Sequence, residues 1–240
     1  MKIHTLLLVP LAAAASMLCS CSTYVTPGKA ANLSLFTDSK VKKAFVAKPA
    51  ISFPADLALV RIQDTGYRSE STQGTGEGAY SVVTTRELET DQDFDAISKN
   101  PGISGVVTLN RLLLPSTLST DEELREAAAK LHADAILIYT VATEFHDNDV
   151  IPPLTTISLG LAPNKKYKIT SIASAILMDT KTGYIYGALE EGDTRGGFTM
   201  AWGSGDAIDG ARRKAERAAF EKLLASFDPF WKRVYTRYKH

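Results

Sequence analysis

Residues 133–141 read Ala-Asp-Ala-Ile-Leu-Ile-Tyr-Thr-Val, which is the strongest strand pattern in the chain. A compact apolar run of this length, rich in β-branched side chains, is typical of a buried strand. It follows directly on a predicted helix over residues 121–131, which Ser119 or Thr120 caps. The apolar positions of this helix lie at helical spacing, namely Leu124, Ala127, Ala128 and Leu131. Because the helix runs straight into the strand, we expect it to pack on the sheet that it enters.

Further elements are predicted toward the N-terminus. A first strand over residues 57–62 is bounded by Pro54 and Gly66 and has the apolar character of a central strand. The Gly-x-Gly-x-Gly of the polar loop that follows is not read as a nucleotide site, because no helix opens directly after it. The next expected elements are a polar loop over 66–78, a strand over 79–86, a helix over 91–99 and a strand through 106–109.

Toward the C-terminus, residues 167–178 and 184–191 are predicted to form an antiparallel hairpin, since a five-residue connection ending in Gly183 joins them. A long helix follows from Ser204 or Asp206 to about Phe227. Its outer face is expected to carry a basic run, Arg212, Arg213, Lys214, Arg217 and Lys222, partly balanced by Glu216 and Glu221. The sequence therefore predicts an α+β fold: a mixed, mainly antiparallel sheet with helices packed on it and a long C-terminal helix, in a single domain over residues 54–240.

The N-terminus has the features of a bacterial export signal. Lys2 precedes an apolar run that ends at Leu18-Cys19-Ser20-Cys21, and this run is too short to span a bilayer. The ending resembles the lipobox of bacterial lipoproteins, which implies a signal peptide over residues 1–20 and acylation of Cys21. An ordinary cleaved signal or a retained N-terminus is the alternative. Since Ser22 rather than Asp follows the cysteine, the resemblance implies the outer membrane, facing the periplasm.

Residues 21–53 are expected to form a tether with an acylated N-terminus. The alternative to a wholly free tether is one of which a part docks on the domain through Leu33, Leu35 and Phe36 or through Phe45 and Val46. Once Cys19 is removed and Cys21 carries lipid, the mature domain has no thiol for disulfides, nucleophilic catalysis or metal binding. The formal net charge of the chain is zero, so no general attraction to nucleic acid is expected.

Little in the chain points to catalysis. The mature histidines, His132, His146 and His240, lack the spacing of a metal or hydrolase motif. The polar cluster at residues 146–149 reads as a turn after a strand rather than as a cation site. The carboxylates of Glu190 and Glu191 point to opposite faces of a strand. No catalytic residue, metal site or cofactor is predicted.

Partner contacts are instead expected from apolar residues. The segment 150–163 is read as an exposed interaction loop, as a segment packed on the domain, or as a pore-forming insertion. In the tail, basic and aromatic residues alternate, which fits lipid headgroups, glycan or an acidic partner, or else a final helix packed by Phe230, Trp231 and Val234. The candidate partner-binding residues are Leu154, Leu159, Leu161, Trp202 and Trp231.

The order of these elements resembles the periplasmic α+β domain of the curli-secretion-channel lipoprotein. The resemblance rests on the lipobox, the first strand, the helix running into residues 133–138, the hairpin over 177–186 and the terminal helix, and it covers about residues 55–227. The same domain type occurs in lipoprotein activators of peptidoglycan synthases and in the N-terminal domain of the Tol translocation protein.

The resemblance implies a non-catalytic interaction or assembly module of the cell envelope. The membrane is reached through the lipid anchor, and the partner is an envelope protein or a second copy of the chain, not nucleic acid. A secretion-pore subunit is a variant of this function. The alternative is a small-molecule or glycan-binding lipoprotein, or a degenerate hydrolase, that uses the loops at 66–78 and 192–205 with Trp202 and the carboxylates of residues 190–193.

Overall fold

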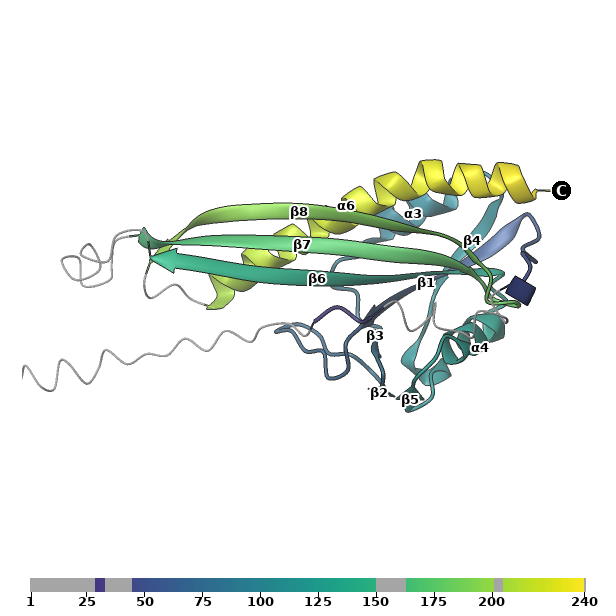
Figure 1. Ribbon diagram of the computed structural model, residues 1–240, viewed down its shortest axis with the longest axis horizontal. Coiled ribbons are helices and arrows are strands. Elements are labelled where there is room, and N and C mark those ends of the chain that lie inside the picture. The colour runs from purple at the N-terminus through teal and green to yellow at the C-terminus, as the bar shows by residue number, and fades with distance from the viewer. Residues whose placement is uncertain (1–28, 33–44, 150–162, 201–204, 240) are drawn as a thin grey trace, which may run out of the picture.

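The computed structural model describes residues 29–32, 45–149, 163–200 and 205–239. In these residues it shows the predicted α+β fold, with a mixed sheet and a long C-terminal helix (Figure 1). The elements are β1 (Ala55–Gln63), β2 (Glu77–Gly78), β3 (Ser81–Val83), α3 (Asp91–Ser98), β4 (Ile103–Thr108), the 3-10 helix η2 (Arg111–Leu113), β5 (Thr117–Leu118), α4 (Glu122–Lys130), β6 (Ala135–Asp149), β7 (Pro163–Asp179), β8 (Ile185–Met200) and α6 (Gly205–Tyr238).

The main sheet has the order β3-β1-β6-β7-β8, and β4 pairs with the same edge of β1 as β3. β1 is parallel to β6 and β4, whereas β6, β7 and β8 form an antiparallel meander. The predicted strand over 79–86 is shorter in the structure. Because β4 already pairs with β1 from Ala55 to Leu59, β3 pairs only with β1 residues from Arg61 onward.

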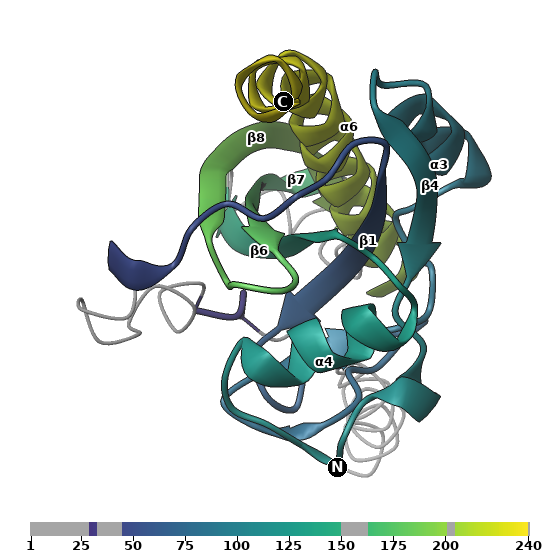
Figure 2. The same ribbon diagram turned by 90° about the vertical axis from the view of Figure 1, so that its right-hand side faces the viewer.

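The sheet is covered on both faces (Figure 2). α3 and α6 pack on one face of the sheet and share one apolar cluster. α4 packs on the other face, against a second apolar cluster. The side chains of β7 alternate between the two faces, since Ala173, Ala175 and Leu177 lie in the cluster under α6 while Ile176 and Met178 lie in the cluster under α4. α4 therefore packs on the sheet that it enters, as expected.

Strands β6, β7 and β8 are much longer than predicted, with 15, 17 and 16 residues. They continue past the end of β1 as a three-stranded arm, made of residues 143–149, 163–171 and 192–200 (Figure 1). At about 3.3 Å per residue, β7 is about 55 Å long. The prediction of a polar turn at residues 146–149 and of a loop from residue 192 is therefore wrong, because both stretches are paired strand.

The register explains how polar residues form strand there. His146 lies opposite Lys168, and the ladder between β6 and β7 continues without a break to Asp149 opposite Lys165. Each residue of this polar stretch therefore has a partner residue on β7, which makes it strand.

α6 is one helix of 34 residues that continues through Pro229, where the sequence indicated an end at about Phe227. A proline in a helix leaves the carbonyl four residues earlier without its donor. Here that carbonyl belongs to Ala225, which is exposed to water. The buried stripe therefore extends from Ala215 to Val234. None of the helices in the described ranges is long and apolar enough to cross a membrane.

Part of the predicted tether is docked on the domain. Ala31 is buried, and its amide donates a hydrogen bond to Thr140 Oγ1 at 3.1 Å. Residue Ala50 donates to Asp179 Oδ2 at 2.8 Å. Phe45 and Val46, which were considered as docking residues, are instead 85% and 71% exposed. Leu33, Leu35 and Phe36 lie outside the described residues.

Candidate functional site

A buried ion network lies between the N-terminal half of α6 and the sheet. Its centre is Arg212, whose side chain is fully buried. The guanidinium donates to Asp209 Oδ1 at 2.8 Å, to Glu216 Oε2 at 2.6 Å and to Glu87 Oε1 at 2.7 Å. The first two partners lie on α6 itself, whereas Glu87 lies in the segment after β3. Arg212 therefore fastens this segment to the helix.

The network continues to β1 through Arg61, which is also buried. Arg61 Nη2 donates to Tyr67 Oη at 3.1 Å, and Arg61 Nη1 lies 3.4 Å from Glu87 Oε2. Burial alone would raise the pKa of the Glu87 carboxyl, but hydrogen bonds from Ser71 and Arg212 and the charges of both arginines lower it to about 2. Glu87 is therefore ionised at any physiological pH.

This network is built for holding elements together rather than for proton transfer. A general acid or base works best with a pKa near the ambient pH, whereas the pKa of Glu87 lies far below it. Glu216 also accepts a hydrogen bond from Thr143 Oγ1 on β6 at 2.8 Å, which ties α6 to the arm.

The prediction that Arg212 and Glu216 lie on the outer face of the helix is wrong. The sequence does carry a signal for this arrangement. Asp209 lies three residues before Arg212 and Glu216 lies four residues after it, so both carboxylates fall on the same helix face as the arginine.

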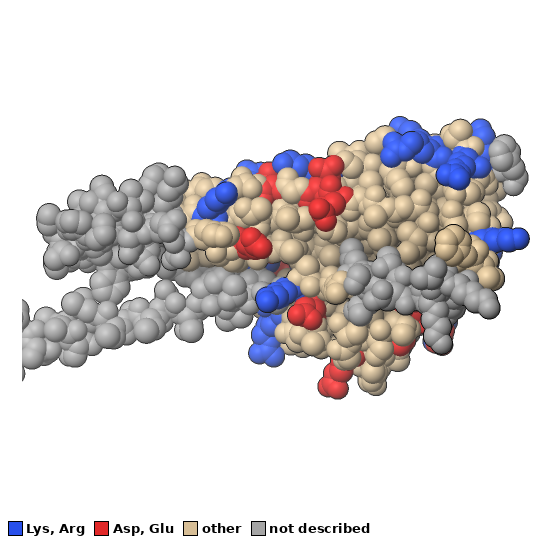
Figure 3. All heavy atoms as spheres, viewed as in Figure 1, with Lys and Arg blue, Asp and Glu red and all other residues tan. Residues whose placement is uncertain are grey.

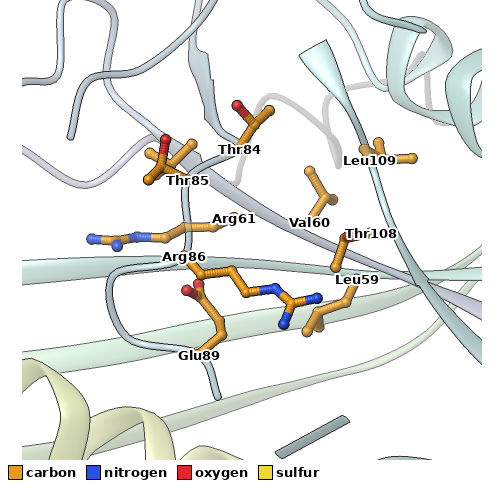
Figure 4. Close-up of a pocket in the computed structure, with 10 residues that line it drawn as sticks. Leu59, Val60, Arg61, Thr84, Thr85, Arg86, Glu89, Thr108 and Leu109 are labelled. Carbon is orange, nitrogen blue, oxygen red and sulfur yellow. The ribbon is translucent and has the colours of Figure 1, made fainter. Parts of the chain in front are cut away.

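A small notch opens at the edge of β1 where β3 and β4 diverge (Figure 4). It is lined by Val60 and Arg61 of β1 and by the threonines that follow β3 and end β4, Thr84, Thr85 and Thr108. Its volume of about 30 Å³ suits a single water molecule rather than a substrate.

The loop at 66–78, which the alternative function would use, has a hollow lined only by its own residues Arg68 to Gln73. Ligand cavities are mostly lined by apolar residues with a few converging polar groups, whereas every residue that lines this hollow is polar or charged. In the described residues, no group of three or more His, Cys, Asp or Glu side chains is placed to hold a metal ion.

The C-terminal end of α6 carries exposed cations beside aromatic rings. The Cζ atom of Arg233 lies 6.0 Å from the ring centre of Phe230, and the Cζ atom of Arg237 lies 5.4 Å from the ring centre of Tyr238. The Nζ atom of Lys239 lies 5.4 Å from the ring centre of Tyr235. We call this set the basic–aromatic end, and Figure 3 shows Lys and Arg gathered there without a neighbouring acidic residue on the visible face.

Two features distinguish the basic–aromatic end from an ordinary solvated helix face. Among the described residues, no carboxylate lies within ion-pair distance of Arg233, Arg237 or Lys239, whereas the neighbouring Lys232 pairs with Asp228. The ring of Tyr238 also continues into a half-buried tyrosine cluster with Tyr184 and Tyr186 on β8 and the turn before it. The cations are therefore held over apolar surface and are free to meet an anionic group.

The sequence-predicted site residues divide into two groups. Cys21, Leu154, Leu159, Leu161 and Trp202 lie outside the described residues. Trp231 is fully buried on the face of α6 that packs on the sheet, and its Nε1 donates to the carbonyl of Pro101 at 2.9 Å. The prediction that Trp231 contacts a partner is wrong, because α6 continues through Pro229 and keeps Trp231 on its buried stripe. The alternative, a final helix packed by Phe230, Trp231 and Val234, is confirmed.

Comparisons with known proteins add little. No family model matches the chain, and no curated protein matches it. Among solved structures, the chain is similar to the hypothetical protein CT253 from Chlamydia trachomatis, with 11% sequence identity and a TM-score of 0.26. The match covers 75% of this chain and 95% of that protein. A similarity at this level carries no argument about function.

Proposed function

We propose that this protein is a lipoprotein, anchored to the outer membrane through acylated Cys21 and facing the periplasm, that acts as a non-catalytic interaction or assembly module of the cell envelope. The observation that carries the proposal is the basic–aromatic end. Arginine and aromatic side chains are the residues that most often dominate protein interfaces. Here the two arginines are exposed and Tyr235 and Tyr238 are half-buried, at the end of the molecule opposite the arm (Figure 1).

The rest of the described surface supports a binding role over a catalytic one. The strongest perturbed carboxylate, Glu87, is enclosed and fixed in its ionised form, so it serves structure. The partner that fits the basic–aromatic end is the acidic face of an envelope protein or of a second copy of this chain, because the uncompensated charges there are positive. The resemblance to envelope assembly lipoproteins agrees with this proposal.

Crosslinking and affinity recovery of the lipidated protein from native membranes tests the proposal. The informative variant carries Arg233→Glu, Arg237→Glu and Lys239→Glu. A matched control carries Lys99→Glu, Arg111→Glu and Lys214→Glu, which changes the net charge equally at exposed positions elsewhere. We expect the wild type and the control to recover the same crosslinked partner and the first variant to lose it.

Two results would overturn the proposal. One is a monomer that carries only a small ligand, which would favour the glycan-binding or small-molecule alternative. The other is equal recovery of the partner by all three proteins, which would show that the basic–aromatic end is not the contact. Mass spectrometry of the mature N-terminal peptide tests the anchor, because an acylated Cys21 adds the mass of its fatty acids.

A further inference from the structure

The outward face of the C-terminal half of α6 carries a stripe of four charged residues. They are Glu221, Asp228, Lys232 and Lys239, and we call them the α6 stripe. Their separations of seven, four and seven residues keep all four on one helix face, because two helical turns take about seven residues. The side chains of Glu221, Asp228 and Lys232 are 57%, 48% and 55% exposed. Figure 1 shows this half of α6 at the outer edge of the molecule, so the stripe faces outward.

Lys239 continues the helical spacing although α6 ends at Tyr238. Its amide donates to the carbonyl of Tyr235 at 3.0 Å, which is the four-residue interval of an α-helix. Its Nζ atom lies 5.4 Å from the ring centre of the same tyrosine. Since Tyr235 comes three residues after Lys232, the side chain of Lys239 stays on the face of the stripe.

The order of the charges makes the α6 stripe complementary to itself. From its N-terminal end the stripe reads acid, acid, base, base, with Phe230 at its midpoint. When two such helices lie antiparallel about a two-fold axis at this midpoint, Glu221 of one copy lies opposite Lys239 of the other, and Asp228 lies opposite Lys232. Each pair occurs twice, because a two-fold interface repeats every contact. At 1.5 Å per residue, the inner pairs lie about 3 Å and the outer pairs about 14 Å along the helix from the axis. A parallel arrangement in register would instead place like charges together.

A hollow of about 310 Å³ between α3 and α6 lies beside the acidic half of the stripe. The carboxylates that line it are those of Asp93, Glu221 and Asp228. Arg217 pairs with both Asp93 and Glu221, so one cation serves two carboxylates. The buried side chains of Ile97 and Phe227 add apolar wall. The hollow therefore suits a side chain with an apolar stem and a cationic end, which is the chemistry of lysine.

We propose that two copies of this chain associate through their α6 stripes in an antiparallel pair, with Lys239 of each copy at the hollow of the other. The inference deepens the proposed function and rests on it, because it names a second copy as the partner of the basic–aromatic end. Among the described residues of its own copy, Lys239 has no carboxylate within ion-pair distance, so it gains one in the pair. Asp228 and Lys232 already pair at 2.6 Å, and the second copy extends this pair to a ring of four alternating charges.

Charge networks of this kind contribute more than isolated surface pairs do. A single exposed helix face is nevertheless smaller than a standard protein interface. We therefore expect the association to be reversible and to depend on the concentration of the protein.

Charge reversal in the full lipidated protein tests the pairing. Two copies with different affinity tags are produced in the same cells, the membranes are dissolved in mild detergent, one tag is captured and the other is measured. The all-basic variant carries Glu221→Lys and Asp228→Lys, and the all-acidic variant carries Lys232→Glu and Lys239→Glu. We expect each of them to pair with itself roughly tenfold less than the wild type, because four attractions become repulsions.

Two combinations restore opposite charges across the axis. An all-basic copy produced together with an all-acidic copy should pair at the level of the wild type. A variant with all four reversals, which reads base, base, acid, acid, should again pair with itself. The matched control, Glu70→Lys with Glu126→Lys, changes the net charge as the all-basic variant does at exposed positions elsewhere, and it should pair like the wild type. Thermal unfolding of each variant confirms that it is folded.

Undiminished self-pairing of the all-basic and all-acidic variants would overturn the inference, as would mixed copies that do not pair or a wild type that recovers no second copy. If crosslinking in native membranes still recovered a different envelope protein through the basic–aromatic end, the proposed function would stand without this inference. The loss of every partner would overturn both. The two failures are therefore distinguishable.

Discussion

Replacing Glu87 by Gln is expected to remove most of the acid sensitivity that the buried ion network gives to folding. The Glu87 side chain is only 3% exposed, and its Oε1 accepts from Arg212 at 2.7 Å. Burial opposes ionisation of this carboxyl, but the hydrogen bonds from Ser71 and Arg212 outweigh burial and lower its pKa from 4.5 to about 2. Gln keeps the shape of the side chain and removes its charge.

The size of the effect follows from linkage. In the unfolded chain, Glu87 titrates near its ordinary value of 4.5. Between pH 4.5 and about 2, the unfolded state therefore binds more protons than the folded state, and the free energy of unfolding rises with pH. At about 1.36 kcal/mol per pKa unit, the difference corresponds to about 3 kcal/mol. This contribution is fully present above about pH 4.5 and is lost as the pH falls toward 2.

Urea unfolding, measured from neutral pH down to about pH 2, reads this out. The control variant is Glu126→Gln, because Glu126 pairs with Lys130 on the surface of α4 and is 70% exposed. We expect Glu87→Gln to be less stable than the wild type at neutral pH and to approach it as the pH falls toward 2, while Glu126→Gln follows the wild type throughout. If Glu87→Gln kept the full acid dependence of the wild type, the reasoning about this network would be refuted.

Three further pairs of variants test the packing of the domain by denaturant unfolding. Trp231→Ala is expected to cost about 3–5 kcal/mol and Trp231→Phe clearly less, because the first leaves a large cavity and the second keeps a ring. Gly102→Ala places a Cβ where it would overlap the ring of Tyr235, at a residue whose φ is +77°. Gly66→Ala is its control, because Gly66 has a similar φ of +74° but no atom close to the added Cβ. Gly102→Ala should therefore destabilise the domain more, and equal effects would contradict the clash. Asp179→Ala removes an acceptor of four hydrogen bonds and should cost about 3 kcal/mol, with Asp179→Asn losing less, and equal losses would show that the hydrogen bonds are not the cause.

The apolar part of the fold could be predicted from sequence because burial leaves a periodic trace. The alternation of Ala173 and Ala175 with Ile176 separates the two faces of β7, and the structure assigns these residues to the two clusters. The spacing of Leu124 and Ala128 likewise identifies the face of α4 that packs on the sheet. In each case the spacing of the apolar residues, two along a strand or three to four along a helix, indicates both the type of element and the face that is buried.

The arm and the site escaped prediction because their signals are polar. His146 and its neighbours look like a turn when they are read alone, and only the lysines of β7 opposite them show that they pair. Arg212 looks like a surface residue because its partner Glu87 is distant in sequence. The basic–aromatic end was visible as alternating residue types, but the sequence does not show which cations have a carboxylate beside them.

The two halves of α6 are attached to the sheet by different chemistry. Toward the C-terminus, Phe227 and Trp231 bury apolar surface, whose contribution does not depend on pH. Toward the N-terminus, beyond the end of β1, the helix faces strands of the arm, and Glu216 meets Thr143 there within the ion network. The network fixes one geometry of helix and arm while Glu87 is ionised, and in the folded domain Glu87 stays ionised down to about pH 2. Acid therefore acts on this attachment by favouring the unfolded chain, in which Glu87 takes up its proton near pH 4.5, and not by loosening the helix from the arm in the folded domain.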